Sequence, residues 1–136
     1  MDLDRFVLAQ DAHQTYRQAV SELRQGRKTS HWMWFVFPQI AGLGRSAIAQ
    51  SYAIADLAEA QAYLAHPVLG PRLIECAEIV AGHLDRTAEQ IFGGIDAMKL
   101  RSSMTLFAAA DPDQPVFAQV IDQFFDGPDP ETVKRL

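Results

Sequence analysis

Lys99, Ser102 and Ser103 are the residues whose types and spacing point most directly to chemistry. On a helix running from Asp96 to about Ala110, with about 100° between successive residues, these side chains fall together with Leu106 on one side. The other sides are largely apolar, which is typical of a central helix, so this strip should face protein or a cleft. A lysine in such a place needs an anion, either a carboxylate from another helix or a bound phosphate. The alternative is that Lys99 reaches solvent and the serines bond to backbone carbonyls.

A second candidate anion site is the segment Arg27, Lys28, Thr29 and Ser30, which comes directly before an expected helix. Two cations beside two hydroxyls and the free backbone N–H groups of a helix start can hold an anion. The alternative is that Ser30 only caps the helix while both cations are solvated.

One histidine and two tryptophans follow this segment directly. His31 is a candidate catalytic residue, because histidine can gain and lose a proton near neutral pH. The alternative is a structural histidine with its hydrogen bonds satisfied. Trp32 and Trp34 point in different directions on a helix, so we expect at most one of them to line a cavity and stack on a ligand ring. The other should belong to the core.

A short loop containing Gly42, Gly44, Arg45 and Ser46 is the third candidate. Glycines let the backbone approach a phosphate closely, and the arginine and serine would supply hydrogen-bond donors. The loop lacks the lysine of a Walker motif and the strand–glycine–helix context of dinucleotide sites, so a simple turn is the alternative. The Gln39 amide could contact a base or ribose, or tie the turn together.

Neither a metal site nor a cofactor site is expected from the sequence. The four histidines are scattered, without the spacing of paired metal ligands on a helix. Cys76 shares a helix side with Leu73 and Val80, which predicts a small buried residue rather than a nucleophile. Because this cysteine is alone, it excludes an internal disulfide and a cysteine-based zinc cluster, as is usual in a reducing compartment.

Composition predicts one globular domain over residues 1–136, because 49% of the residues are apolar and only 21% are charged. The longest apolar run, Trp32–Phe37, is far shorter than the roughly 20 residues that span a bilayer, so no membrane segment is expected. A net charge of −5 argues against nucleic-acid binding. The acidic start of the chain lacks the features of a secretory signal, so we expect a cytoplasmic protein.

Helix caps and breakers predict an all-α fold of seven or eight short helices, with at least six helices and no sheet of more than three strands. Residues 46–54 show no clear period, so a short extended segment is left open there. Trp34, Phe107, Val120 and Phe124 are expected to be buried. The expected helices begin at Asp2 or Asp4 (ending at Gly26), Ser30, Leu57 (ending at Ala65), Pro71 (continuing to Leu84), Thr87 (ending at Gly93), Asp96, Pro115 and Asp129.

The chain also resembles the bacterial family known as domain of unknown function 1810. The resemblance lies in the run Gly26–Gln39 with its aromatic block, Trp32–Phe37, followed by Gly42, Gly44 and Ser46, and in further stretches at 52–54, 66–73 and 91–107. It implies a mainly helical fold and implies no reaction. Some members are labelled calpastatin, but such inhibitors are long, polar and disordered until bound, whereas this chain is apolar and compact.

The interpretation we prefer is one pocket formed by the aromatic block, the glycine loop (42–46) and the Lys99 helix. Its ligand would be an anionic, phosphate-bearing small molecule, for example a nucleotide or an ADP-ribose-like compound. Arg27, Arg45 and Lys99 would bind its charge, the serines would donate hydrogen bonds, and one tryptophan would stack on a ring. The Lys99 ammonium should then lie within about 8 Å of the aromatic block or the glycine loop.

If the pocket is catalytic, hydrolysis of an N-glycoside is the first reaction to test, with His31 or Asp96 as the acid–base group. This choice follows a fainter resemblance to the helical family that processes ADP-ribose and related N-glycosides, in the general layout of an aromatic segment followed by a lysine-bearing helix. The alternative is a non-catalytic protein-interaction module, whose partner the sequence does not name. A concave site with a buried Lys99 favours the ligand, and a flat apolar patch favours the partner.

Overall fold

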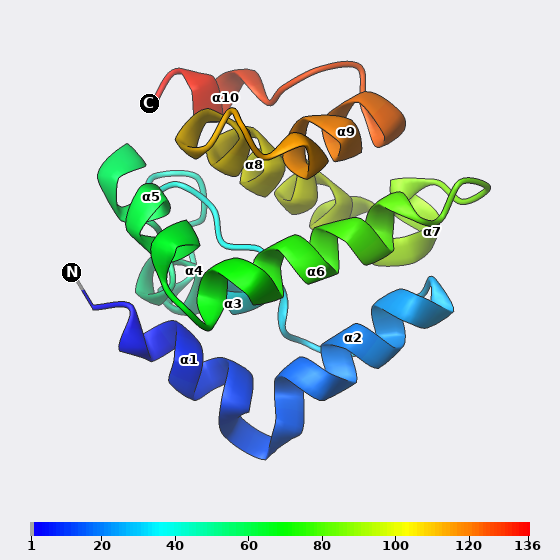
Figure 1. Cartoon of the computed structure of the whole chain (residues 1–136), viewed down its shortest axis with the longest axis horizontal. Helices are drawn as coiled ribbons and strands as arrows, with labels where there is room; N and C mark the ends of the chain where they lie inside the picture. The colour runs from blue at the N-terminus through cyan, green and yellow to red at the C-terminus, as the bar shows by residue number, and fades with distance from the viewer. Residues whose placement is uncertain (1) are drawn as a thin grey trace.

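The computed structural model describes residues 2–136 and is mainly helical (Figure 1). Within these residues the extended backbone forms a single isolated pair, a parallel bridge between Ile40 and Ile54. None of the described helices combines the length and hydrophobicity needed to cross a membrane. The expectation of an all-α fold is confirmed; Met1, which belongs to the expected domain, lies outside the described residues. The helices are α1 (Asp4–Asp11), η1 (Ala12–Gln14), α2 (Thr15–Gln25), α3 (Met33–Val36), α4 (Ala47–Ser51), α5 (Leu57–Ala65), α6 (Leu69–Ala81), α7 (Ala88–Phe92), α8 (Gly94–Ala110), α9 (Pro115–Phe124) and α10 (Pro130–Val133).

The first expected helix is in fact divided into α1 and α2. His13 and Gln14 adopt left-handed φ angles of 54° and 59°, which end one helix and start the next at a sharp bend (Figure 1). Gly26 ends α2 with a φ of 75°, as its position predicted. Neither Asp2 nor Asp4 caps α1, so that expectation was wrong.

The segment between α2 and α5 also differs from the prediction. The helix expected to start at Ser30 is only the short α3, and no side chain caps it. Residues 46–54, left open as an extended segment, contain α4, and only Ile54 pairs in an extended conformation. The Ser46 hydroxyl explains the helix, because it accepts a hydrogen bond from the backbone N–H of Ala49 at 3.2 Å.

Most of the later helix boundaries follow local signals that the sequence shows. Asp56 caps α5, Thr87 forms a capping box at α7, and Asp129 caps α10. The bounds expected for α6 were wrong, because this helix begins two residues before Pro71 and ends before Leu84, which is 83% exposed. Proline is tolerated there because the first turn of a helix does not need its N–H.

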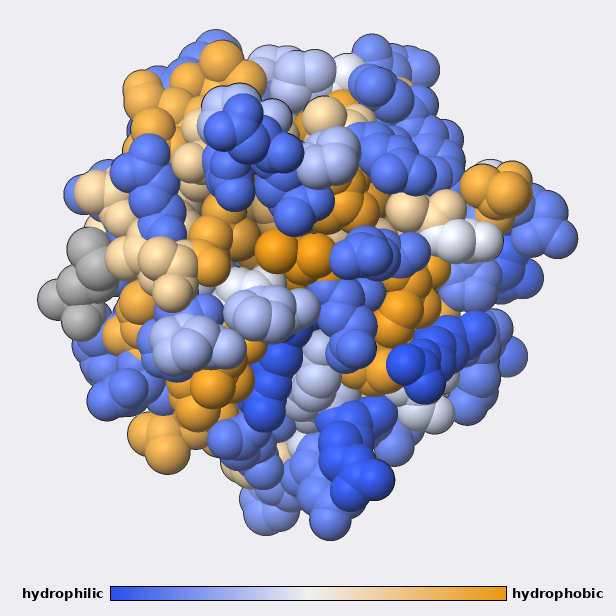
Figure 2. All heavy atoms as spheres, in the orientation of Figure 1, coloured by the Kyte–Doolittle hydropathy of each residue, from blue (hydrophilic) through white to orange (hydrophobic). Residues whose placement is uncertain are grey.

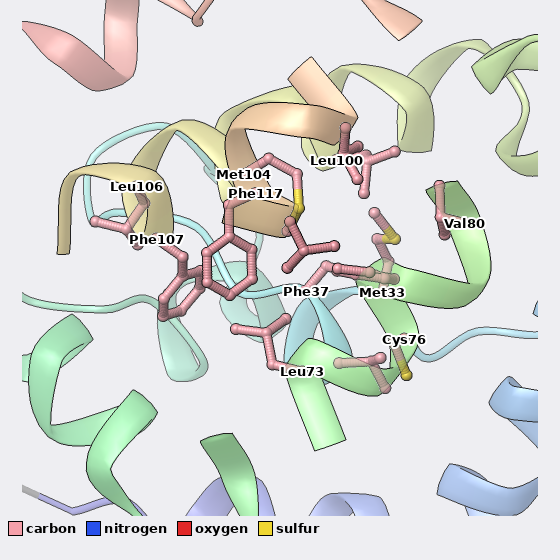
Figure 3. Close-up of a cluster of buried hydrophobic side chains, with 14 of the residues drawn as sticks. Met33, Phe37, Leu73, Cys76, Val80, Leu100, Met104, Leu106, Phe107 and Phe117 are labelled. Atoms are coloured by element: carbon pink, nitrogen blue, oxygen red, sulfur yellow. The ribbon is translucent and has the colours of Figure 1, made fainter. Parts of the chain in front are cut away.

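The core lies where α6 and α8 pack against α5 and α9, with α3 beneath them (Figures 1 and 3). Cys76 is fully buried among the apolar side chains of this core, as predicted. Phe107 and Val120 are also buried as predicted. Trp34 and Phe124 are only partly buried, and this corrects the expectation for both. Phe124 is the last residue of α9, at the edge of the core, and Trp34 lies beside the cleft described below.

The helix α8 is not enclosed on all sides, contrary to the expectation from its composition. Ser102, Ser103 and Leu106 are buried, but Ile95 and Met98 are exposed on its first turns. On the face shown in Figure 2, hydrophobic residues appear in separate patches between hydrophilic ones. The start of α8 therefore lies at the surface, while its second half lies in the core.

Candidate functional site

Two lysines and two tryptophans meet around one carboxylate, that of Asp96. Lys28 Nζ lies 2.9 Å from Asp96 Oδ2, and Lys99 Nζ lies 3.7 Å from Asp96 Oδ1. Each ammonium also lies over an indole, 5.0 Å from the ring centroid for Lys28 and Trp32 and 5.1 Å for Lys99 and Trp34. We call these five residues the Asp96 cluster. The prediction that the Lys99 ammonium lies within about 8 Å of the aromatic block is confirmed. The carboxylate beside it belongs to the same helix, and not to another helix as expected.

Local backbone geometry brings the members of this cluster together. The backbone N–H of Lys28 donates a 2.7 Å hydrogen bond to the carbonyl of Ile91, which fixes the loop after α2 against α7. Gly93, with a φ of 81°, then turns the chain from α7 into α8. This turn places Asp96 in the first turn of α8, where a carboxylate is favourable, and Lys99 three residues later on the same side.

In the Asp96 cluster two ammonium groups share one carboxylate, and a second carboxylate, that of Glu22, accepts a hydrogen bond from Trp32 Nε1 at 3.0 Å. Lys28 is the enclosed cation: its side chain is 7% exposed, and its ammonium also donates to the Ser30 carbonyl at 2.5 Å. Lys99 is farther from Asp96, and its side chain is 25% exposed. Lys99 is therefore the member of the cluster that can reach a second anion.

A cleft with a volume of about 340 Å³ lies beside Lys99, which we call the Lys99 cleft. Its volume falls within the range of small-molecule sites. Trp34 lines a narrower recess next to it, together with Gln39 and Gly44. The cleft is therefore built from Gln39, the glycine loop, α8 and the C-terminal residues. Its lining residues are Gln39, Leu43, Gly44, Ile95, Met98, Lys99, Arg101, Ser102, Asp129 and Glu131.

The other polar groups of the cleft are largely used by the fold. Arg101 donates to the carbonyl of Gly127 at 2.8 Å and so holds the segment before α10. The Ser102 hydroxyl lies 3.2 Å from an Asp129 carboxylate oxygen. Although burial opposes its ionisation, hydrogen bonds from Thr132 and Ser102 and the charge of Arg101 hold the pKa of Asp129 below its ordinary value. Lys99 is thus the cation of this cleft that remains available to a ligand.

Ser103 does not reach the cleft, because it is fully buried in the core. Its hydroxyl is a buried side-chain group without a hydrogen-bond partner among the described residues. We therefore expect Ser103→Ala to stabilise the protein by about 1 kcal/mol, since it removes an unsatisfied polar atom. Urea unfolding checks this value, and a loss of stability in the variant would contradict it.

The loop that was expected to bind an external anion binds a carboxylate of the chain itself. Glu22, on α2 and 3% exposed, accepts hydrogen bonds from the backbone N–H groups of Thr29 (2.7 Å) and Ser30 (3.0 Å). It also accepts from the Ser30 hydroxyl (2.5 Å), Trp32 Nε1 (3.0 Å) and Gln18 Nε2 (2.9 Å). Ser30 is therefore not the helix cap that its position indicated. Its hydroxyl and its backbone N–H both bind Glu22.

Burial alone would raise the pKa of Glu22, but the hydrogen bonds from Ser30, Thr29 and Gln18 lower it to about 2. Sequence reasoning missed this residue. The available signal was its position between Ala19 and Leu23 on the buried side of α2, where an unpaired carboxylate would be costly. Glu22 thus fixes the loop that carries Lys28 and leads to the tryptophans.

The remaining candidate residues lie outside the Lys99 cleft. Arg27 and Arg45 are exposed, and Ser46 caps α4. Gly42, with a φ of 99°, lies against the side chain of Arg135 rather than in the cleft. His31 lines a different cavity. The single pocket expected from the sequence is therefore divided: Gln39, Gly44, Lys99 and Ser102 line one cleft, with Trp34 and Asp96 beside it.

Comparisons with known proteins agree with this helical architecture. The model of the family described as protein of unknown function (DUF1810) matches residues 1–136. The chain belongs to this family. It is also similar to the conserved hypothetical protein Rv1873 from Mycobacterium tuberculosis, whose crystal structure gives a TM-score of 0.96 at 51% sequence identity, over 99% of this chain and 96% of that chain. No curated protein matches. The resemblance to the DUF1810 family stated from the sequence is confirmed.

Proposed function

We propose that the Lys99 cleft binds an anionic small molecule that carries a phosphate group, of about the size of a nucleotide or smaller. The observation that carries this proposal is the partly exposed Lys99 ammonium, which lies 3.7 Å from Asp96 and lines a cleft of about 340 Å³. Asp96 lies closer to Lys28 than to Lys99, so the Lys99 ammonium can move to a ligand while Asp96 keeps a partner. An anion at this position would replace Asp96 as the partner of the Lys99 ammonium.

The lining of the cleft supports a ligand with one charged end and one less polar part. The phosphate would lie against Lys99 and near Gly44, which also lines the cleft. The Gln39 amide can donate a hydrogen bond to it. Ile95 and Met98 are exposed beside the cleft and would contact a ring or another apolar part of the ligand.

Two carboxylates lie in the cleft lining as well and restrict where the anion can lie. Asp129 and Glu131 would repel a phosphate, so the charged group belongs near Lys99. Carboxylate oxygens also accept hydrogen bonds from hydroxyl groups, which would suit a sugar. The proposal includes no reaction, because Asp96 is engaged by both lysines and His31 lines another cavity.

A thermal-shift screen tests this proposal. The compounds would be nucleotides, sugar phosphates and ADP-ribose, compared with the uncharged nucleosides and sugars. A ligand present at about 100 times its dissociation constant stabilises the folded state by about 2.7 kcal/mol. We expect an anionic compound to raise the melting temperature of the wild-type protein and to have no effect on Lys99→Met.

The matched control is Arg24→Met, which removes a positive charge from an exposed position on α2, far from the cleft lining. This variant should keep the full ligand-induced shift. An equal shift in Lys99→Met and the wild type would contradict the proposal. Failure of the whole panel would also contradict it and would favour the protein-interaction alternative, with Ile95 and Met98 as exposed contact residues.

A further inference from the structure

A second cavity, with a volume of about 720 Å³, lies between the start of α2 and the residues that precede α3. Its lining includes His13 from η1, Thr15 and Arg17 from α2, and Ser30 and His31 from the loop between α2 and α3. None of these residues lines the Lys99 cleft. The proposed function therefore makes no use of this cavity.

The available donors of this cavity are guanidinium and imidazole groups, since the hydroxyls of Thr15 and Ser30 already donate to the Ala12 carbonyl and to Glu22. The imidazoles of His13 and His31 make no hydrogen bond within residues 2–136, whereas ring nitrogens of His66 and His83 bond to backbone groups. Arg17 is exposed, and in the described part of the chain its guanidinium forms no ion pair. These groups remain available to a ligand, unlike the other two histidines.

The backbone conformation brings His13 to the same cavity as His31. His13 and Gln14 have backbone φ angles of 54° and 59°, which residues other than glycine rarely adopt. Strained residues of this kind persist only where the surrounding structure holds them, and they are concentrated at functional sites. Here the strained turn separates α1 from α2 and leaves His13 in the cavity lining.

The nearby carboxylates already have partners within the chain, although Glu22 is held by neutral donors and keeps its negative charge. Glu22 lies behind Ser30 and accepts the hydrogen bonds described above. Asp11 pairs with Arg72 at 2.8 Å. Among the described residues there is also no cluster of three metal-ligating side chains. A lining of guanidinium and imidazole groups suits a phosphate oxyanion rather than a metal cation.

We propose that this cavity is a second anion site, which binds inorganic phosphate or the phosphate group of a small molecule independently of Lys99. The probe is inorganic pyrophosphate, added with a chelator at constant pH and ionic strength, and the readout is the NMR signals of the histidine rings. We expect the signals of His13 and His31 to shift in a saturable way. The signals of His66 and His83 should stay constant, and they serve as internal controls. Absence of any shift, or equal shifts in all four rings, would overturn the proposal.

Two arginine variants test the same site without relying on histidine signals alone. Arg17→Met should weaken pyrophosphate binding about tenfold, the loss expected for one charge-assisted hydrogen bond. Arg24→Met, which removes the same charge from the other end of α2, should leave the affinity unchanged. Equal losses in both variants would show a general charge effect and overturn the proposal. Lys99→Met should leave the shifts of His13 and His31 unchanged, so failure of the Lys99 cleft and failure of this site are distinguishable.

A further variant tests whether the strained turn at His13 contributes to pyrophosphate binding. His13→Gly removes the imidazole and places at this position the residue that best tolerates a left-handed φ. We expect a higher melting temperature together with weaker pyrophosphate binding, which is the pattern of a residue kept for function at a cost in stability. A variant that binds pyrophosphate as tightly as the wild type would overturn the role of His13.

Discussion

Replacing Glu22 by alanine is expected to destabilise the protein by about 3–5 kcal/mol, the largest effect predicted for a single residue outside the apolar core. The carboxylate is buried and accepts hydrogen bonds from Thr29, Ser30, Trp32 and Gln18. Its removal would leave two backbone N–H groups and an indole N–H without an acceptor. Urea unfolding followed by tryptophan fluorescence measures the loss.

Two further variants separate the hydrogen bonds from the general effect of substitution. Glu22→Gln keeps the size of the side chain but presents an NH₂ group to several donors, so a smaller loss of about 2 kcal/mol is expected. Glu78→Ala removes an exposed glutamate from α6 and should change the stability by less than about 0.5 kcal/mol. Similar losses for Glu22→Ala and Glu78→Ala would contradict the anchoring role of Glu22.

Glu22 should also contribute to the acid sensitivity of the fold. The pKa of its carboxyl falls from an ordinary value of 4.5 to about 2 in the folded state, so the unfolded chain binds the proton more tightly. The stabilisation, which corresponds to about 3 kcal/mol, is fully present above the ordinary value and is lost as the pH falls toward 2. The wild type should therefore lose stability more steeply than Glu22→Gln over this range. Parallel curves for the two proteins would contradict this assignment.

Lys28→Met is expected to destabilise the protein by about 3 kcal/mol, at the lower end of the cost of breaking a buried ion pair. The variant removes the closer partner of Asp96 and leaves the Ser30 carbonyl without its donor. Lys99→Met should cost less than about 1 kcal/mol, because Lys99 is partly exposed and Asp96 keeps Lys28. Chemical denaturation of both variants gives the two values.

This pair of variants tests which of the two lysines, Lys28 or Lys99, is the structural partner of Asp96. A small loss for Lys28→Met and a large one for Lys99→Met would mean that Lys99, and not Lys28, is the structural cation of the cluster. That result would contradict the assignment of Lys99 as the cation available to a ligand. The comparison also decides whether Lys99→Met is suitable for ligand measurements, since that variant must remain folded.

Sequence reasoning located the parts of the fold that depend on local signals. The bounds of α5 were predicted correctly because Asp56 caps the helix and His66-Pro67 ends it. The capping box of Thr87 is equally local. The division between α1 and α2 could not be predicted, because His13 and Gln14 adopt left-handed angles without a glycine to indicate them.

The candidate site was also predicted only in part, because helical spacing shows which residues share a side but not how distant segments meet. The helical spacing around Lys99 indicated correctly that its ammonium lies near the aromatic block with a carboxylate beside it. That carboxylate is Asp96, one turn earlier on the same helix, and the helix projection did not select it. The bonds between Glu22 and the loop at 29–32 depend on how the chain folds back after Gly26, which spacing alone does not reveal.

The measurement that tests the central claim most directly is the affinity of the Lys99 cleft for the anionic compound that gives the largest thermal shift. Isothermal titration would be carried out with the wild type, Lys99→Met and Arg24→Met. Loss of one charge-assisted contact should weaken binding to Lys99→Met at least about tenfold, while Arg24→Met binds like the wild type. If Lys99→Met binds the compound with the affinity of the wild type, Lys99 does not hold the anion and the proposed role of the cleft is wrong.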